Sequence, residues 1–428
     1  MKKFLVGKKV LLVAVFFLFV SASVFAGGGS QKEGAGPVTI EMWGWNAGQM
    51  EQIFAHYKEV TGATANLNYV AVSQQETFQK LQTVVSAGLD LPDIVPSEAG
   101  QRGTMVSLDM WEDVTKAPYN FDLNSIFAYL QPLCKNEKGE MVTVPFDITS
   151  AALAYKRDLA EKYLGVSDPA AVQALFPNRD AFVAKGKEVQ VASGGKVFML
   201  YGPSAIFQIA SGQNPAPIVK NNKLDLAPVK AVIDEIVRFR DNGIADNIIN
   251  DTPAWSASFV DDTHIFYPCA SWTPEYQIMS NDPKGPTHPW GLIVPPGGAF
   301  SWGGTGFMIP KEAKHKLEAF KFVQWLLSKD AVMWMHEKYF YNLCNVEAAK
   351  DPVLANLTNP YFGDQNLGTV FYGAADTITP RPISQYDVII QDTFNLVTEQ
   401  LNSQKNLTAG EALKIFETEF RNKAPDIQ

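Results

Sequence analysis

Hydrophobic residues along the chain follow two spacings, one typical of strands and one typical of helices. Residues 38–43 carry apolar side chains at alternate positions, and residues 50–57 follow with the i, i+3, i+4, i+7 spacing of an amphipathic helix. Gly62 is placed to end this helix, and residues 65–72 have the composition of the next strand. A helix and a short buried strand repeat the order over residues 77–95. Repeated strand–helix–strand units predict α/β sheets covered by helices.

The same order recurs in the second half of the chain. Residues 197–201 form an apolar run, and a helical pattern follows over residues 229–237 and ends near Gly243. Residues 307–309 predict another short strand. Thr408 and Glu411 form a capping box ahead of a final helix. A second α/β region is therefore expected.

The first residues have the layout of a secretory signal peptide. Four lysines precede an apolar run over residues 10–20, and small residues lead to Ala26. Eleven apolar residues are too few to span a bilayer, which needs about 20, although a retained membrane anchor stays open as the alternative. We expect a signal peptide over residues 1–26, a glycine-rich flexible leader over 27–36, and no lipid anchor, because no cysteine lies near the junction.

Length and charge limit the possible partners. About 390 residues follow the leader, which suits two or more hydrophobic cores. The net charge of −9 includes the four signal-peptide lysines, so the mature chain carries −13. Nucleic acid is not expected as a partner, because it requires a basic surface.

The three cysteines, Cys134, Cys269 and Cys344, lie far apart in the sequence. At most one bridge can form among them. Buried free thiols are the favoured interpretation, and a single disulfide stays open.

Local motifs of catalysis and metal binding are missing from the sequence. The five histidines show no metal-ligand spacing, and no Gly-x-Ser-x-Gly elbow exists. The glycines at 194–195 and 303–306 lack the remaining residues of a phosphate loop or a dinucleotide fingerprint. We predict no catalytic residue, metal or cofactor, although two carboxylates brought together about 5–9 Å apart could still form a glycosidase site.

Tryptophans stand where predicted strands end: Trp43 and Trp45 after the first strand, Trp272 after residues 265–269, and Trp302 before a glycine turn. Ligands of open α/β sheets bind at the carboxyl ends of strands. Aromatic planes suit the apolar faces of a sugar ring, and planar polar groups suit its hydroxyl rim. Each tryptophan could equally belong to the core, but their grouping at strand ends favours a sugar site.

Several segments, taken in order, resemble the extracellular solute-binding proteins of ABC importers, in particular the maltose-binding-like sugar-binding group (family 1). The resemblance is carried by residues 38–43, 86–94, 144–147, 153–159, 271–272, 302–310, 322–326 and 380–382. It implies a two-lobed periplasmic-binding-protein fold. Each lobe would hold a mostly parallel sheet flanked by helices, and the chain would cross the hinge several times.

The resemblance also implies lobe boundaries and ligand residues. The N-terminal lobe would comprise residues 37–147 and 300–348, and the C-terminal lobe residues 148–299 and 349–428. The ligand-binding residues carried over from the family are Trp43, Trp45, Asn46, Glu98, Arg102, Phe146, Asp147, Trp272, Trp302, Gly303, Gly304 and Arg381. Glu98 could equally be a solvated loop carboxylate.

The expected function is therefore capture of a mono- or oligosaccharide outside the cytoplasm. The bound sugar would pass to the membrane permease subunits of an ABC importer, and the binding protein would act as a monomer. Two alternatives stay open: binding of a non-sugar solute such as a polyamine, which an acid-rich cleft would favour, and a secreted carbohydrate-active enzyme.

Overall fold

The computed structural model describes residues 36–356 and 358–428, and residues 38–428 form one compact unit. The predicted signal peptide, residues 1–26, and the predicted leader up to residue 35 lie outside the described residues.

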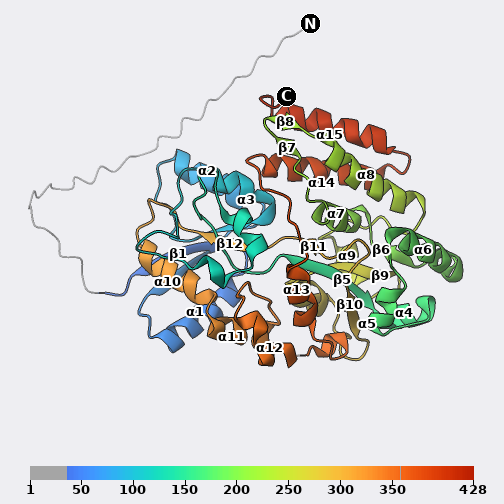
Figure 1. Ribbon diagram of the computed structural model, residues 1–428, viewed down its shortest axis with the longest axis horizontal. Coiled ribbons are helices and arrows are strands. Elements are labelled where there is room, and N and C mark those ends of the chain that lie inside the picture. The colour runs from blue at the N-terminus through green and yellow to red at the C-terminus, as the bar shows by residue number, and fades with distance from the viewer. Residues whose placement is uncertain (1–35, 357) are drawn as a thin grey trace, which may run out of the picture. The chain divides into compact units, whose positions relative to one another are not determined.

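The first group of strands gathers segments from both halves of the chain. β1 pairs in parallel with β2, Met42 bridges in parallel to Ile94, and β12 pairs with both β3 and β4. The strands are β1 (Thr39–Gly44), β2 (Asn66–Ala71), β3 (Val95–Glu98), β4 (Val144–Pro145) and β12 (Thr305–Met308). The helices around them are α1 (Ala47–Thr61), α2 (Thr77–Ser86), α3 (Ala99–Val106), α10 (Lys316–Leu326) and α11 (Lys329–Tyr339). These elements occupy the left of Figure 1.

The second group of strands has the order β10-β5-β9-β6, with β11 on β5. These strands are β5 (Ser150–Lys156), β6 (Phe198–Leu200), β9 (His264–Ala270), β10 (Trp290–Ile293) and β11 (Phe300–Ser301). The helices beside them are α4 (Arg157–Leu164), α5 (Pro169–Ala174), α6 (Arg179–Ser193), α7 (Pro203–Gly212), α9 (Pro253–Ser258), α12 (Pro352–Asn356) and α13 (Leu367–Ala375). Apart from α12 and α13, which lie in the lower middle, they occupy the right of Figure 1.

Three long helices pack together beside this second group. They are α8 (Leu226–Asp241), α14 (Asp387–Ser403) and α15 (Ala409–Lys423), and a small hairpin of β7 (Val219–Lys220) and β8 (Lys223–Leu224) precedes α8. α14 also packs against α3 and α7, so it touches elements from both groups of strands.

Strand directions within the two groups correct one expectation. Most pairs are antiparallel, including β5 with β9, β10 and β11, and β12 with β3 and β4. Only β1–β2 and β6–β9 pair in parallel among the named strands. β5 and β12 each enter their sheet directly from the other group, without a crossover helix. Their direction is therefore not set by a strand–helix–strand unit.

The chain crosses between the two groups more than once, as expected. Residues 146–149 join β4 to β5, and residues 302–304 lead from β11 back to β12. A third passage follows α11, where Leu343 bridges to Asp147 and α13 packs against β5. These three neighbouring segments, residues 146–149, residues 302–304 and the segment after α11, therefore form the joint between the two groups of strands.

Local signals placed several elements correctly. α1 ends at Gly62, whose φ of 70° is the left-handed conformation that glycine adopts at little cost. The capping box is confirmed, with Thr408 and Glu411 bonded to each other's backbone N–H groups. The short buried strand expected to end at residue 95 instead begins there, at Val95, although Ile94 already forms a parallel bridge to Met42. The Asp93 carboxylate accepts hydrogen bonds from the N–H groups of Glu41 and His315.

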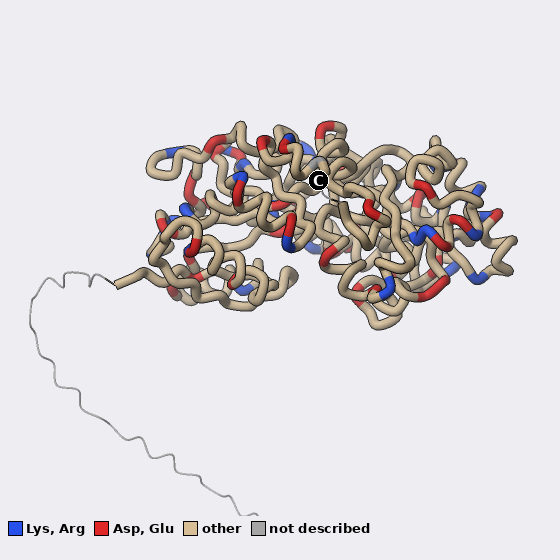
Figure 2. Tube along the Cα trace, turned by 90° about the horizontal axis from the view of Figure 1, so that it is seen from below, with Lys and Arg blue, Asp and Glu red and all other residues tan. Residues whose placement is uncertain are grey.

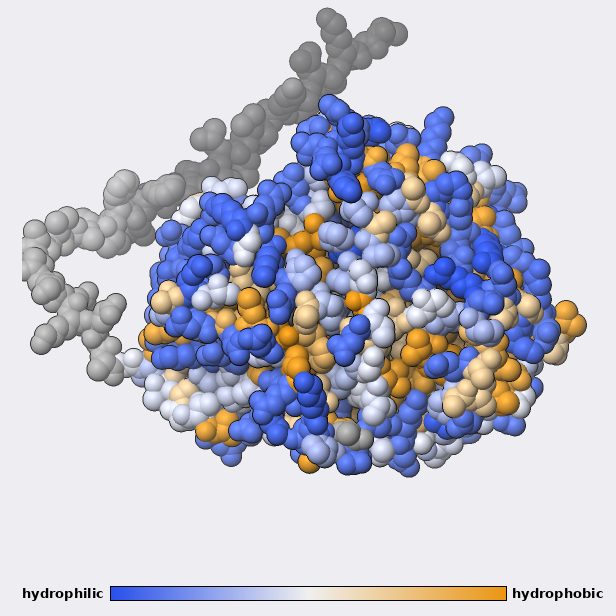
Figure 3. Space-filling view, viewed as in Figure 1, coloured by the Kyte–Doolittle hydropathy of each residue, from blue (hydrophilic) through white to orange (hydrophobic). Residues whose placement is uncertain are grey.

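The cysteines are free, and the surface carries both signs of charge. Cys134, Cys269 and Cys344 are all buried and form no disulfide. Acidic and basic residues are interspersed along the trace in Figure 2, and Figure 3 shows hydrophobic side chains in scattered patches among hydrophilic ones. Among the helices of the described residues, none is both long enough and apolar enough to cross a membrane.

Candidate ligand-binding cleft

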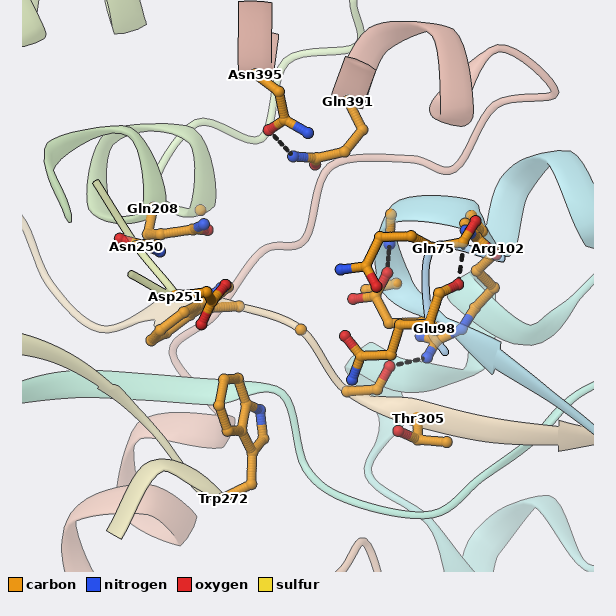
Figure 4. Close-up of a pocket in the computed structure, with 18 of the residues that line it drawn as sticks. Gln75, Glu98, Arg102, Gln208, Asn250, Asp251, Trp272, Thr305, Gln391 and Asn395 are labelled. Atoms are coloured by element: carbon orange, nitrogen blue, oxygen red, sulfur yellow. Dashed lines mark hydrogen bonds between the residues drawn. The ribbon is translucent and has the colours of Figure 1, made fainter. Parts of the chain in front are cut away.

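A cleft of about 1480 Å³ lies where elements of the two strand groups face each other. One side is formed by the loop after β1 together with α2 and α3. The other side is formed by α7, residues 248–251 and residues 272–277. The crossing segment 301–305 and α14 complete it. Figure 4 shows Gln75, Glu98 and Arg102 facing Gln208, Asn250 and Asp251 across this space.

The structure brings most of the predicted ligand residues into this cleft. Those that line it are Trp45, Asn46, Glu98, Arg102, Asp147, Trp272, Trp302, Gly303, Gly304 and Arg381. They come from six separate stretches of sequence. Their common position supports the expectation that strand ends form the site.

Trp43 and Phe146 lie elsewhere. Trp43 is 2% exposed, packs in the apolar cluster that includes Val95 and Met308, and donates its indole N–H to Glu41. Phe146 is 7% exposed and packs against Phe307 and Tyr341. Trp43 lies within β1 and packs into the core, whereas Trp45 follows the last strand residue, Gly44, and lines the cleft from the loop.

Two tryptophans form an aromatic corner at the floor of the cleft. The ring centroids of Trp272 and Trp302 lie 4.9 Å apart at an angle of 58°. Gly303 and Gly304 follow with φ of 64° and 96°, and a Cβ on Gly303 would lie 3.1 Å from the Trp272 indole nitrogen. A larger residue at 303 would be strained in backbone and crowded against the ring. Both indoles remain partly exposed and can meet an apolar ligand face.

Arg102 occupies a buried position behind this floor and is 2% exposed. Its Nη2 donates to the carbonyl oxygens of Ser97, at 3.2 Å, and Gly304, at 2.6 Å. The guanidinium therefore ties the end of β3 to the return crossing. These two bonds support the floor, while the Nε of Arg102 is buried without a hydrogen-bond partner among the described residues.

Three carboxyl groups lie near Arg102, and burial raises the pKa of each. The pKa of Asp147 rises to about 6, opposed by hydrogen bonds such as that from the Thr305 N–H. Asp387 also rises to a pKa of about 6, with the charge of Arg381 opposing the rise. Burial likewise raises the pKa of Glu98, which accepts a 2.7 Å hydrogen bond from the Gly100 N–H. The cleft floor thus holds one guanidinium among three desolvated acids.

Tyr276 joins the two sides of the cleft. Asn46 donates from Nδ2 to the Tyr276 hydroxyl at 3.0 Å, and that hydroxyl donates to the Gln49 side chain. Tyr276 also packs edge-on against Tyr341, which bonds to Asp147. It lies in a single π-helical turn, Pro274–Met279, a geometry that recurs at functional sites.

Sequence reasoning missed Tyr276, Tyr341 and a large set of carboxamides. Ten glutamines line the cleft, and three of them, Gln75, Gln79 and Gln82, stand at helical spacing along α2 and the turn before it. The signal was present in the sequence as a glutamine-rich run over residues 74–82. Which face of α2 looks into the cleft could not be known without the packing.

The chemistry of the cleft is that of hydrogen bonding and stacking. None of the five histidines lines it. Within residues 36–356 and 358–428, no three His, Cys, Asp or Glu side chains gather as a metal-binding group. Aromatic rings can stack on the apolar face of a ring-shaped polar solute. Carboxamides, hydroxyls and carboxylates can form hydrogen bonds with its rim.

The family model of the bacterial extracellular solute-binding proteins matches residues 52–359. This chain belongs to that family. The family consists of proteins that bind a substrate rather than enzymes, and its description places them outside the cytoplasm. No curated protein sequence matches the chain.

Solved structures show the same two-lobed fold for this solute-binding protein. An extracellular solute-binding protein of family 1 matches with a TM-score of 0.80 at 19% identity, covering 91% of this chain and all of the other. The galacto-N-biose-/lacto-N-biose I-binding protein of Bifidobacterium longum, solved with lacto-N-biose, matches at 0.73 and 19%, covering 92% and 98%. Maltose-bound MalE3 of T. maritima matches at 0.69 and 16%, covering 90% and 100%. Two of these three neighbours were solved with a bound sugar, lacto-N-biose and maltose, and the first of these two belongs to an ABC transporter.

Proposed function

We propose that this protein captures a sugar in the cleft and delivers it to the permease of an ABC importer. The observation that carries the proposal is the Trp272–Trp302 corner at the cleft floor, flanked by polar groups from both sides. A pyranose ring would lay an apolar face on one indole, and its hydroxyl rim would meet Asn46 and the nearby carboxylates. The sugar-bound neighbours support the same ligand class.

The proposed lobes are residues 37–147 with 300–348, and residues 148–299 with 349–428. Support comes from the strands, since β1–β4 and β12 fall in the first set and β5–β10 in the second. β11 (Phe300–Ser301) stands at the proposed boundary, because it falls in the first set but pairs with β5 of the second. A ligand that touches both lobes stabilises the closed state, because it binds that state more tightly than the open one. The three crossings around Asp147 are the proposed hinge.

The ligand-contacting residues we propose are Trp45, Asn46, Asp147, Trp272, Trp302 and Arg381, with Gly303 and Gly304 giving the ring access. All line the cleft. Glu98 and Arg102 would support the floor from behind. Trp43 and Phe146 would act through packing, since both are buried away from the cleft.

Export as a monomer through a signal peptide, with cleavage after Ala26 and no lipid anchor, completes the proposal. The amino-terminal layout of lysines, apolar run and small residues supports it. Intact-mass analysis of the secreted protein tests the cleavage site. Light scattering tests the monomeric state.

A cationic solute is the second candidate, because seven carboxyl groups and only two arginines line the cleft. The deciding experiment is a thermal-shift screen of residues 27–428 with mono- and oligosaccharides, polyamines and amino acids, followed by calorimetry and product analysis of each hit. A selective ligand raises the melting temperature as RT ln(1 + [L]/Kd) predicts. Response to a sugar that is recovered unchanged supports the proposal. Response to polyamines alone, or conversion of the sugar, contradicts it.

A further inference from the structure

The cleft is larger than the tryptophan corner needs. Its volume of about 1480 Å³ exceeds the range of about 300–1,000 Å³ typical of sites for one small ligand. In Figure 4, Trp272 lies at the lower end of the space, and the hydrogen-bonded pair Gln391–Asn395 lies at the upper end. Between them, residues of α7 and the 248–251 loop face residues of the first strand group. We call this upper part the outer cleft.

Carboxamides dominate the outer cleft. Gln75, Gln79 and Gln82 stand at i, i+4, i+7 spacing, and their amide groups make no hydrogen bond to another described residue. On α14, the cleft residues Gln391, Asn395, Thr398 and Asn402 likewise share one helix face. A carboxamide donates and accepts, so it can pair with a hydroxyl in either orientation.

Buried polar atoms without hydrogen-bond partners also indicate that the outer cleft can bind hydroxyl groups. Thr398 is only 7% exposed and lines the cleft, yet its hydroxyl has no hydrogen-bond partner among the described residues. The side-chain oxygens of Asn402 and Gln101 are also buried and unpartnered there. Burying such groups unpaired costs free energy, and a ligand hydroxyl would remove that cost.

The ionisable side chains of the outer cleft are acidic rather than basic. No lysine or histidine lines the cleft, and Arg102 is already bonded to two carbonyl groups. Asp251 stands in the outer wall with φ of 59°, is exposed, and forms no ion pair with another described residue. Partial desolvation raises the pKa of Asp251, and no neighbouring cation offsets its charge when it is ionised. A negatively charged ligand unit there would meet repulsion without compensation.

We infer that the outer cleft is a second sugar-binding subsite, which takes further uncharged units of an oligosaccharide and rejects uronate units. The inference rests on the proposed sugar binding and adds the ligand's minimum length and charge class to it. The Gln75–Gln79–Gln82 row binds hydroxyls, and Asp251 opposes carboxylates. Arg381, which lines the cleft and acts on the charge of Asp387, is the remaining cleft cation that opposes this selection.

The test measures calorimetric affinity for malto- and galacto-oligosaccharides of one to four units and for oligogalacturonates of the same lengths. The full mature protein is compared with two variants. Q79A/Q82A removes two exposed amides of the row, and Q324A on α10 is its control, an exposed glutamine outside the cleft. D251N removes the charge while asparagine tolerates the left-handed backbone. D364N is its control, because Asp364 is exposed outside the cleft with a φ of 58°.

The expected result is that affinity for neutral sugars rises beyond one or two units. Q79A/Q82A should lower the affinity for the longest neutral sugar about tenfold and leave the shortest unchanged. Oligogalacturonates should bind at least about tenfold more weakly, and D251N should narrow that gap. Neither Q324A nor D364N should change the ratio of affinities between long and short neutral sugars, or between neutral sugars and oligogalacturonates.

Other results overturn the inference in distinguishable ways. If one sugar unit binds as tightly as four, and Q79A/Q82A has no effect, the outer subsite is wrong while sugar binding stands. If oligogalacturonates bind as tightly as neutral sugars, the charge selection is wrong. If no sugar of any length binds, the proposed function fails together with the inference.

Discussion

The Asp147 carboxylate accepts a 2.6 Å hydrogen bond from the backbone N–H of Thr305, and this bond joins the outward crossing of the chain to the return crossing. The other oxygen of Asp147 accepts from the Tyr341 hydroxyl, which follows α11 and begins the third passage. One buried side chain therefore touches all three segments of the joint.

Replacing Asp147 should cost stability according to how many of these bonds survive. Asp147→Ala should lower the unfolding free energy by about 2–4 kcal/mol, because it leaves buried donors without an acceptor. Asp147→Asn keeps one acceptor oxygen and should cost less. Urea unfolding at pH 7 measures both, and equal losses would contradict the assigned role of the acceptor.

The pH dependence of stability should also distinguish wild type from Asp147→Asn. Burial raises the pKa of Asp147 from 3.8 to about 6, so its titration contributes stability that is present below about pH 4 and lost as the pH rises through 6. The asparagine variant lacks this titration. The difference in unfolding free energy, wild type minus variant, should therefore fall by up to about 3 kcal/mol between pH 4 and pH 7. If the unfolding free energies of wild type and Asp147→Asn depend on pH in the same way, Asp147 is not desolvated.

Trp272→Ala should weaken binding of the sugar found in the thermal-shift screen with little loss of stability. The indole is partly exposed at the cleft floor, and an aromatic anchor is worth ~2 kcal/mol, or about 30-fold in Kd. Trp290 is the matched contrast, since it is fully buried and its indole N–H bonds to Asp282. Trp290→Ala should cost about 3–5 kcal/mol of stability. A large drop in melting temperature for Trp272→Ala would place that side chain in the core.

Tyr276→Phe should shift the ligand-free protein toward a more open state. The lost hydroxyl bonds to Asn46 and Gln49 across the cleft, and one hydrogen bond worth about 1 kcal/mol changes the population ratio about fivefold. X-ray scattering should show a larger radius of gyration without ligand and an unchanged one with saturating ligand. Tyr163→Phe on α4, outside the cleft, is the control. Equal radii for Tyr276→Phe and wild type would mean that this contact does not hold the lobes.

The three cysteines should resist thiol reagents in the native protein. Each is buried, and burial raises the pKa of Cys134 to about 11 and those of Cys269 and Cys344 further above their usual value. The thiolate, which is the reactive form, is therefore scarce at pH 8. Labelling should be negligible in buffer and reach three thiols per chain in denaturant without reductant. Recovery of only one thiol would reveal a disulfide.

Local sequence determined the parts of this protein that depend on near neighbours. The helical spacing of residues 50–57 and Gly62 predicted α1, and Thr408 with Glu411 predicted the start of α15. Strand ends rich in tryptophan and polar residues predicted most of the cleft floor. These signals are readable because periodicity, capping and turn formation act within a few residues.

Tertiary structure decided what depends on distant segments. Trp43 and Trp45 are two residues apart, yet packing puts the first in the core and the second in the cleft. The antiparallel entry of β5 and β12 and the meeting of Asn46 with Tyr276 likewise join residues far apart in the chain. Such pairings follow from how whole sheets and helices pack, since no local hydrogen bond or spacing encodes which distant surface a side chain will meet.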